Sequence, residues 1–204
     1  MNKLVAVANL EAEIFTAQDL SVIWGYADER KLYELIKYYV RQKEIFVLTR
    51  GLYALEDYSQ SDLRNQPQIL MKIANRLVPN SYVSLFTILR QEGVIVQYYD
   101  EIYSVATRSV TRTVKGIEFV YQQVKEEVLL SDLGVHNQGE IRFASLERAV
   151  TDMWYLYPKL HLENLSQVNL KKLKKIVDLY QKKAMREKLL EIESEKSKLK
   201  DNNA

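Results

Sequence analysis

The sequence predicts an α+β fold, in which helices and strands occupy separate stretches of the chain. Apolar residues recur with a helical period in residues 29–43, and β-branched and aromatic residues dominate residues 94–124. Helical spacing returns from residue 166 onward. Because helices do not alternate with the strands in βαβ order, we expect a mixed sheet flanked by helices and followed by a helical extension.

The composition narrows the classes of function open to the chain. Its 204 residues are 47% hydrophobic and 27% charged, which is ordinary for a globular protein with a sizeable core. It has no cysteine and only His136 and His161, so we expect neither a metal nor a cofactor. No apolar run is long enough for a membrane span, and the first residues lack a signal-peptide pattern. These features favour a cytoplasmic protein.

Helix signals follow one another in the first residues of the chain. Apolar positions predict a helix at residues 3–14. Thr16 predicts the start of a second helix, because Asp19 three residues later can return the capping hydrogen bond. Gly25 predicts the end of that helix, since glycine readily takes the left-handed conformation found at helix ends.

A third helix and a hairpin complete the N-terminal part. Asp28 is an N-cap candidate for residues 29–43, whose apolar side chains lie on one stripe. Strand formers at 45–48 and 52–55 flank Gly51, which supplies the positive φ that a tight hairpin needs. The order helix, helix, turn, helix, hairpin is typical of a winged helix-turn-helix.

The third helix of such a fold lies in the major groove of DNA, with the hairpin beside it. Its polar face would contact bases and phosphates together with the hairpin tip. The candidate DNA-binding residues are Arg30, Lys31, Lys37, Tyr38, Arg41 and Arg50. The alternative is a solvated helix with surface pairs among Glu34, Lys37 and Arg41, and a solvated turn residue at the hairpin tip.

Further elements are expected after a polar segment at residues 56–68, which is a linker or the lead-in to a helix. They are helices at 67–77, 84–93 and 145–157, strands at 94–99, 101–107, 112–114, 117–124 and 141–144, and a loop at 129–140. The predicted parts are a winged helix-turn-helix at 1–57, a linker at 58–66, an α+β domain at 67–160 and a helical extension at 161–204.

The helical extension is expected to begin at Ser166, an N-cap candidate followed by apolar residues at helical spacing. A long coiled coil is not expected, because Glu187 and Glu191 fall where a heptad pattern needs apolar residues. Residues 193–204 are strongly polar and predict a solvated, frayed tail.

Charge is distributed unevenly along the chain. Residues 1–57 carry 7 Lys/Arg and 9 Asp/Glu, residues 58–158 carry 10 and 11, and residues 159–204 carry 12 and 7. Nucleic-acid binding therefore depends on the local placement of charge. The net charge of −2 on residues 1–57 keeps open a different class of function, an adaptor whose winged helix binds protein.

Two further groups of polar residues are candidate sites. Arg108, Arg112 and Lys115 lie in a strand-rich segment and form a possible surface for RNA, DNA or an acidic partner, if Arg108 and Arg112 share one strand face. The alternative is the exposed face of an antiparallel sheet. Arg148 and Asp152 are four residues apart on a predicted helix, which favours a structural ion pair over catalysis. We expect no enzymatic activity.

Two motifs and the hairpin resemble the AbiE antitoxin family, over roughly residues 15–157. In the first motif, a Tyr–Ser–Leu pattern before a short helix resembles Tyr82, Ser84, Leu85, Leu89, Gly93 and Ile95. In the second, a pattern of small residues, Glu–basic–Ala and a later Asp resembles Ala144, Ser145, Glu147, Arg148, Ala149, Val150 and Asp152. The segment "LTRGLYAL" is similar to the wing of that family.

The resemblance implies a bacterial antitoxin of a type IV toxin–antitoxin system, with an N-terminal winged helix and a C-terminal α+β domain. Such an antitoxin binds operator DNA and represses its own operon as a transcriptional regulator. It also counters a nucleotidyltransferase-like toxin encoded alongside it, usually without a stable complex. The sequence does not determine the oligomeric state.

Overall fold

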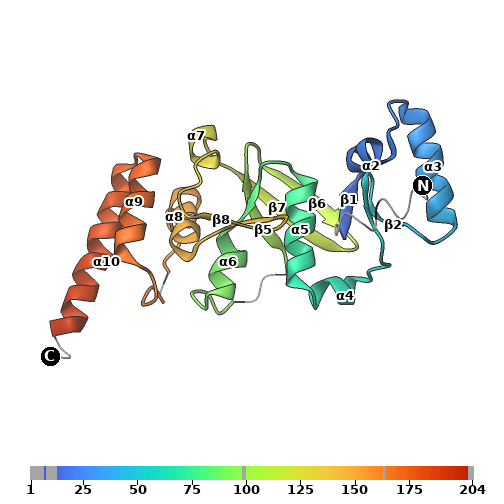
Figure 1. The fold of residues 1–204 in the computed structure, drawn as a ribbon. Coiled ribbons are helices and arrows are strands. Elements are labelled where there is room, and N and C mark those ends of the chain that lie inside the picture. Colours follow the sequence, from blue (N-terminus) through green and yellow to red (C-terminus); the bar gives the residue numbers. More distant parts are fainter. Residues whose placement is uncertain (1–6, 8–12, 98–99, 163, 202–204) are drawn as a thin grey trace.

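The computed structural model describes residue 7 and residues 13–97, 100–162 and 164–201. The molecule is elongated (Figure 1). The N-terminal helices and strands lie at one end, a six-stranded sheet lies in the middle, and two C-terminal helices lie at the other end. Helices and strands are not in βαβ alternation, so the predicted α+β class and the helical C-terminal region are confirmed.

Within residues 13–54, three short strands and two helices form the N-terminal end. They are β1 (Ile14–Thr16), α2 (Ala17–Trp24), α3 (Glu29–Arg41), β2 (Phe46–Thr49) and β3 (Leu52–Ala54). β3 is the central strand and pairs antiparallel with β1 and β2. The prediction of a helix up to residue 14 is wrong at its end, because Ile14 begins β1. Val7 is helical, and residues 3–6 and 8–12 lie outside the described residues.

The predicted start and stop signals are present as local geometry. Thr16 Oγ1 accepts a hydrogen bond from the N–H of Asp19 at 3.1 Å, and the Asp19 carboxylate accepts one from the N–H of Thr16 at 2.7 Å. Gly25 ends α2 with a φ of 68°, and the Asp28 carboxylate caps α3. Gly51 has a φ of 80° at the tip of the β2–β3 hairpin, as a tight hairpin requires.

Two helices connect the N-terminal end to the central sheet. The segment expected to be a linker or a helix lead-in contains α4 (Gln60–Arg64), which begins with a capping box between Ser59 and Asp62. α5 (Pro67–Leu77) follows as predicted, with proline in its first turn, where the missing N–H costs no hydrogen bond. α5 packs against β1 and against β4 and β9 of the central sheet.

The central sheet has the strand order β6-β7-β5-β4-β9-β8. Its strands are β4 (Tyr82–Val83), β5 (Ile102–Ala106), β6 (Val110–Val114), β7 (Ile117–Gln123), β8 (Val135–Gln138) and β9 (Ile141–Ala144). β5 pairs parallel with β7 and β4 parallel with β9, and the other neighbours are antiparallel. The helices α6 (Leu85–Gln91), α7 (Glu126–Leu129) and α8 (Leu146–Leu156) belong to the same region.

Two expectations for this region are wrong. Residues 94–97 are not part of a strand, and Val96 is 97% exposed, while residues 98–99 lie outside the described part. The predicted loop at 129–140 contains β8, which pairs with β9 through a tight connection at Gly139. The turn residues of this segment, such as Gly139, therefore connect the strands of the β8–β9 hairpin, which the composition of the segment did not predict.

The C-terminal region consists of α9 (Leu170–Tyr180) and α10 (Lys183–Asp201). The predicted N-cap at Ser166 is wrong: the side chain of Asn169 accepts the hydrogen bond from the N–H of Lys172 at 3.2 Å. The expected frayed tail is helical as far as Asp201, and residues 202–204 lie outside the described part. No helix among the described residues has the length and apolar character that a membrane crossing needs.

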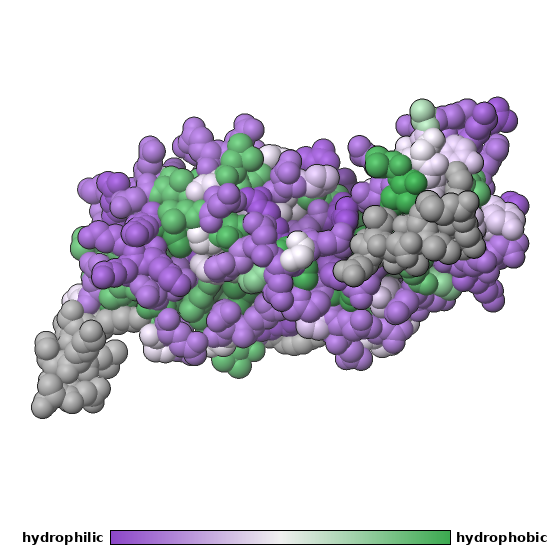
Figure 2. All heavy atoms as spheres, in the orientation of Figure 1, coloured by the Kyte–Doolittle hydropathy of each residue, from purple (hydrophilic) through white to green (hydrophobic). Residues whose placement is uncertain are grey.

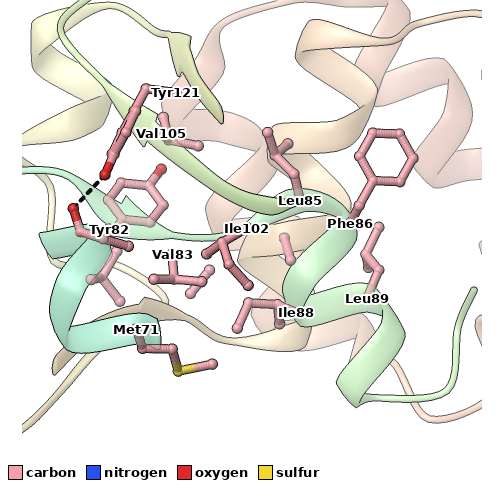
Figure 3. Close-up of a cluster of buried hydrophobic side chains, with 14 of the residues drawn as sticks. Met71, Tyr82, Val83, Leu85, Phe86, Ile88, Leu89, Ile102, Val105 and Tyr121 are labelled. Atoms are coloured by element: carbon pink, nitrogen blue, oxygen red, sulfur yellow. Dashed lines mark hydrogen bonds between the residues drawn. The ribbon is translucent and has the colours of Figure 1, made fainter. Parts of the chain in front are cut away.

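One large core runs through the molecule. Figure 3 shows its centre, where Met71 from α5, Tyr82 and Val83 from β4, and Ile102 from β5 lie close together beside α6. The hydroxyl of Tyr121 on β7 donates a hydrogen bond to the carbonyl of Ala74 on α5 at 2.6 Å. The same core includes Ile14 in the N-terminal sheet and Ile192 on α10.

Candidate nucleic-acid interface

The outer face of α3 is available to a partner. Leu32 and Ile36 are buried against Trp24, Phe15 and their neighbours in a small N-terminal core, which fixes the orientation of the helix. The predicted DNA-binding side chains lie away from this core. They are exposed without exception: Arg30, Lys31, Lys37, Tyr38 and Arg41.

The charges on α3 are divided between its two ends. The first turns carry exposed Asp28, Glu29 and Glu34, and Glu34 forms an exposed ion pair with Arg30 at 3.5 Å. This matches in part the alternative of surface pairing, although the partner of Glu34 is Arg30. Lys37 and Arg41 form no ion pair with another described residue, and Arg41 lies in the last turn, where the helix dipole favours a cation. The net charge is therefore −1 over residues 28–34, which include Arg30 and Lys31, and +2 over residues 37–41.

Arg50 lies at the tip of the β2–β3 hairpin and is exposed. The hairpin is held to α2, because the carbonyl of Gly51 accepts a hydrogen bond from the N–H of Ala17 at 3.2 Å. Tyr38 on α3 is 54% exposed and rests with its ring edge against Tyr39, at a centroid separation of 5.3 Å. The β2–β3 hairpin and α3 thus each carry an exposed polar side chain, Arg50 and Tyr38, on a regular backbone element.

The opposite face of the N-terminal sheet packs against the second half of the chain. Ile14, Leu48 and Leu52 belong to the large core. Arg76 on α5 bridges the two halves by pairing with Asp19 at 3.1 Å and also with Glu140. α3 lies on the far side of this sheet in Figure 1, and its polar side chains are exposed.

The second predicted strip is dispersed. Arg112 is exposed on β6, but Arg108 lies in the bend before that strand, so strand periodicity does not place the two on one face. Lys115 lies in the β6–β7 turn and pairs with Asp57 at 3.6 Å. β2 of the N-terminal sheet lies against β6. Of the three residues, Lys115 therefore lies at the boundary between the two halves, while Arg108 and Arg112 are exposed.

The motif around Arg148 and Asp152 forms a buried polar network. Both side chains are fully buried on α8 and lie 3.5 Å apart, which confirms the predicted ion pair. The Asp152 carboxylate accepts hydrogen bonds from the hydroxyls of Ser84 at 2.7 Å, Tyr82 at 3.0 Å and Tyr180. Ser84 precedes α6 as predicted, but its hydroxyl donates to Asp152 and forms no capping hydrogen bond.

Arg148 completes the network from the other side. Its guanidinium donates to the Tyr82 hydroxyl at 3.0 Å and to the backbone carbonyls of Leu133 at 2.8 Å and Val128 at 2.6 Å. Burial raises the pKa of Asp152, while the guanidinium and the three hydroxyl donors oppose that rise. The buried network thus links side chains from β4, α8 and α9.

Glu147, next to Arg148 on α8, also connects α8 to α9. It lies in the first turn of α8, as predicted, and is buried. Its carboxylate accepts a hydrogen bond from the backbone N–H of Asn169 at 3.0 Å, at the start of α9. Sequence reasoning missed this contact, because nothing local to Glu147 indicates that a helix 22 residues later begins beside it.

Comparison with known proteins adds no family. A scan against protein-family models gives no match for this chain, and a search of curated proteins gives no similar sequence. The fold and the exposed surfaces are therefore the observations on which a function is proposed.

Proposed function

We propose that this protein is a DNA-binding transcriptional regulator whose residues 1–57 form a winged helix-turn-helix. The observation that carries the proposal is the set of exposed polar side chains on the outer face of α3, next to a hairpin with an exposed arginine at its tip. α3 would enter the major groove, with Lys37 and Arg41 on bases and phosphates and Arg50 on an adjacent phosphate or the minor groove.

The resemblance of the two motifs to AbiE antitoxins extends the proposal. The protein would repress its own operon and counter a nucleotidyltransferase-like toxin encoded beside it. In this proposal the α+β domain carries the antitoxin activity, and the buried Arg148–Asp152 network stabilises that domain without taking part in chemistry.

The experiment changes Arg41 and Arg50 to alanine together and measures binding to the protein's own promoter DNA over a series of salt concentrations. We expect weaker binding and a log–log salt slope smaller by about 2, because each lost phosphate contact removes about one released counterion. Lys125→Glu changes the net charge by the same amount at an exposed position on the second half, and we expect it to leave the slope unchanged.

Co-expression with a nucleotidyltransferase-like toxin tests the antitoxin part separately. The double variant is expected to restore growth as the natural chain does while repression of the promoter is lost. Equal promoter binding by the double variant and the natural chain would reject α3 and the hairpin as the DNA surface.

A protein-binding adaptor is the second candidate. The net charge of −2 on residues 1–57 and the exposed Val22 on α2, 77% accessible, favour it. An adaptor would show no promoter binding at low salt and would form a stable complex with a protein through α2 or α3.

A further inference from the structure

α9 carries the densest unpaired positive charge of the described chain. Lys171, Lys172, Lys174 and Lys175 are all exposed on its first two turns. The only exposed acid on this helix, Asp178, pairs with Arg186 at 3.2 Å. None of the four lysines forms an ion pair within the described residues.

These lysines are unfavourable for the helix itself. The N-terminal end of a helix carries the positive end of its dipole, so cations in the first turn are destabilising. Lys171 also lies three and four residues from Lys174 and Lys175, where like charges repel. Glu147 offsets the dipole only from the buried side, through the N–H of Asn169. The arrangement therefore lacks a counter-charge on its outer face.

Three nearby lysines differ because each has a partner in the chain. Lys183 pairs with Glu187 at 3.6 Å, and the ammonium of Lys188 donates to the carbonyl of Pro158 at 2.6 Å. The ammonium of Lys182 lies 5.8 Å from the ring centre of Tyr155. The four lysines of α9 thus lack the partners that these three lysines have.

The chemistry of the helix restricts what can bind to it. Its apolar face is buried through Leu173, Ile176 and Val177, so α9 has no free apolar face to insert into a membrane. Its one aromatic residue, Tyr180, is also buried, so the helix offers no ring on which unpaired bases could stack. Lysine ammonium groups are compact charges that match phosphates presented along the outside of a duplex.

We propose that the lysine face of α9 binds the phosphate backbone of duplex DNA without sequence preference. α9 and α3 lie at opposite ends of the elongated molecule (Figure 1), so this surface is separate from the one proposed for the promoter. The protein would hold a second segment of DNA at its C-terminal end. Binding of DNA by α9 does not require that α3 also binds DNA.

The test compares two variants of the full chain. One changes Lys171, Lys172, Lys174 and Lys175 to glutamine, and the matched control changes the same four to arginine. Fluorescence anisotropy with a random-sequence DNA duplex is followed over salt concentration. We expect the glutamine variant to reduce the log–log salt slope by about 3 to 4, since each lysine neutralises one phosphate, and the arginine variant to keep it.

Further variants separate the contributions of the individual lysines and of α3. We expect the glutamine variant to fold, because it removes the repulsion between exposed lysines. Two double variants divide the effect, and each should reduce the salt slope by about 2: Lys171→Gln with Lys172→Gln, and Lys174→Gln with Lys175→Gln. The Arg41→Ala, Arg50→Ala variant keeps the lysine-dependent part of the slope, which separates this proposal from the promoter surface. An unchanged slope in the glutamine variant overturns the proposal. So does lysine-dependent binding confined to RNA or to anionic lipid vesicles.

Discussion

At the scale of single residues, identical local signals lead to different hydrogen bonds. Ser84 and Ser145 both precede a helix, and both are N-cap candidates by sequence. Ser145 accepts the capping bond from the N–H of Arg148 at 3.2 Å, whereas Ser84 donates to the buried carboxylate of Asp152 at 2.7 Å. The i, i+4 spacing of Arg148 and Asp152 predicted their pairing correctly. The hydroxyls that surround the pair come from distant parts of the chain and could not be predicted.

Removing the buried carboxylate tests the importance of this network. Asp152→Ala is expected to lower the free energy of unfolding by about 3–5 kcal/mol, because Arg148 is left buried without its counter-charge. The measurement is urea denaturation at neutral pH. Asp178→Ala is the matched control, since it removes the exposed partner of Arg186 and is expected to cost less than about 1 kcal/mol. Similar losses in the two variants would contradict a special role for the buried pair.

At the scale of elements, the sequence predicted helices better than strands. The caps at Thr16, Asp28 and Ser145 act within a few residues, so the helices they begin are visible in the sequence. β1 is only three residues long and exists because Ile14 enters the large core while Phe15 enters the small N-terminal core. Strand pairing is a contact between distant segments, so a short strand has little signature of its own.

Gly134 is an element-scale constraint between α8 and α9. It has a φ of 74°, and an added Cβ would lie 2.7 Å from Cδ1 of Ile176 on α9 and 3.0 Å from Cβ of Arg148 on α8. Gly134→Ala is therefore expected to destabilise the protein by about 2–4 kcal/mol, through both the backbone conformation and overpacking.

Gly139→Ala provides the control for backbone conformation alone. Gly139 also has a positive φ, of 57°, but an added Cβ meets no atom within 4 Å. We expect a loss of about 1 kcal/mol there, so the difference between the variants in thermal and urea denaturation reports the contact with α9. A loss at Gly134 no larger than that at Gly139 would show that α9 can move away freely.

At the scale of the whole molecule, the N-terminal sheet, the central sheet and the C-terminal helices share one core. Ion pairs cross the boundary of the N-terminal part, including Arg76 with Asp19 and Lys72 with Glu13. Hydrophilic side chains cover most of the face in Figure 2, with apolar ones in separated groups. The two proposed DNA surfaces are thus carried by one packed body and do not depend on a flexible tether.

The many buried tyrosines predict loss of stability in alkaline solution. Burial raises the pKa of Tyr58 to about 12 from its ordinary value of 10.0, and it also raises the pKa of Tyr82, Tyr121 and Tyr180. A raised pKa means that the folded protein holds the proton more tightly than the unfolded chain does. The stabilisation is therefore complete below pH 10.0 and is lost as the pH rises through about 12.

Urea denaturation at several pH values, together with the ultraviolet absorbance of tyrosinate, measures this loss. The free energy of unfolding is expected to fall above pH 10.0, with the buried tyrosines ionising only as the protein unfolds. Stability that stays constant across this range would contradict the burial of these hydroxyls.

The sequence by itself determined the α+β class, the main helices with their caps, the β2–β3 hairpin and the pairing of Arg148 with Asp152. These features depend on contacts within a few residues, or on a periodicity that a short window contains. Only the tertiary structure decided that β1 and β8 are strands, that Ser84 serves Asp152, that Lys115 pairs with Asp57, and that α9 buries its apolar face and exposes four lysines. The physical reason is that burial and pairing across the chain depend on which distant segments meet.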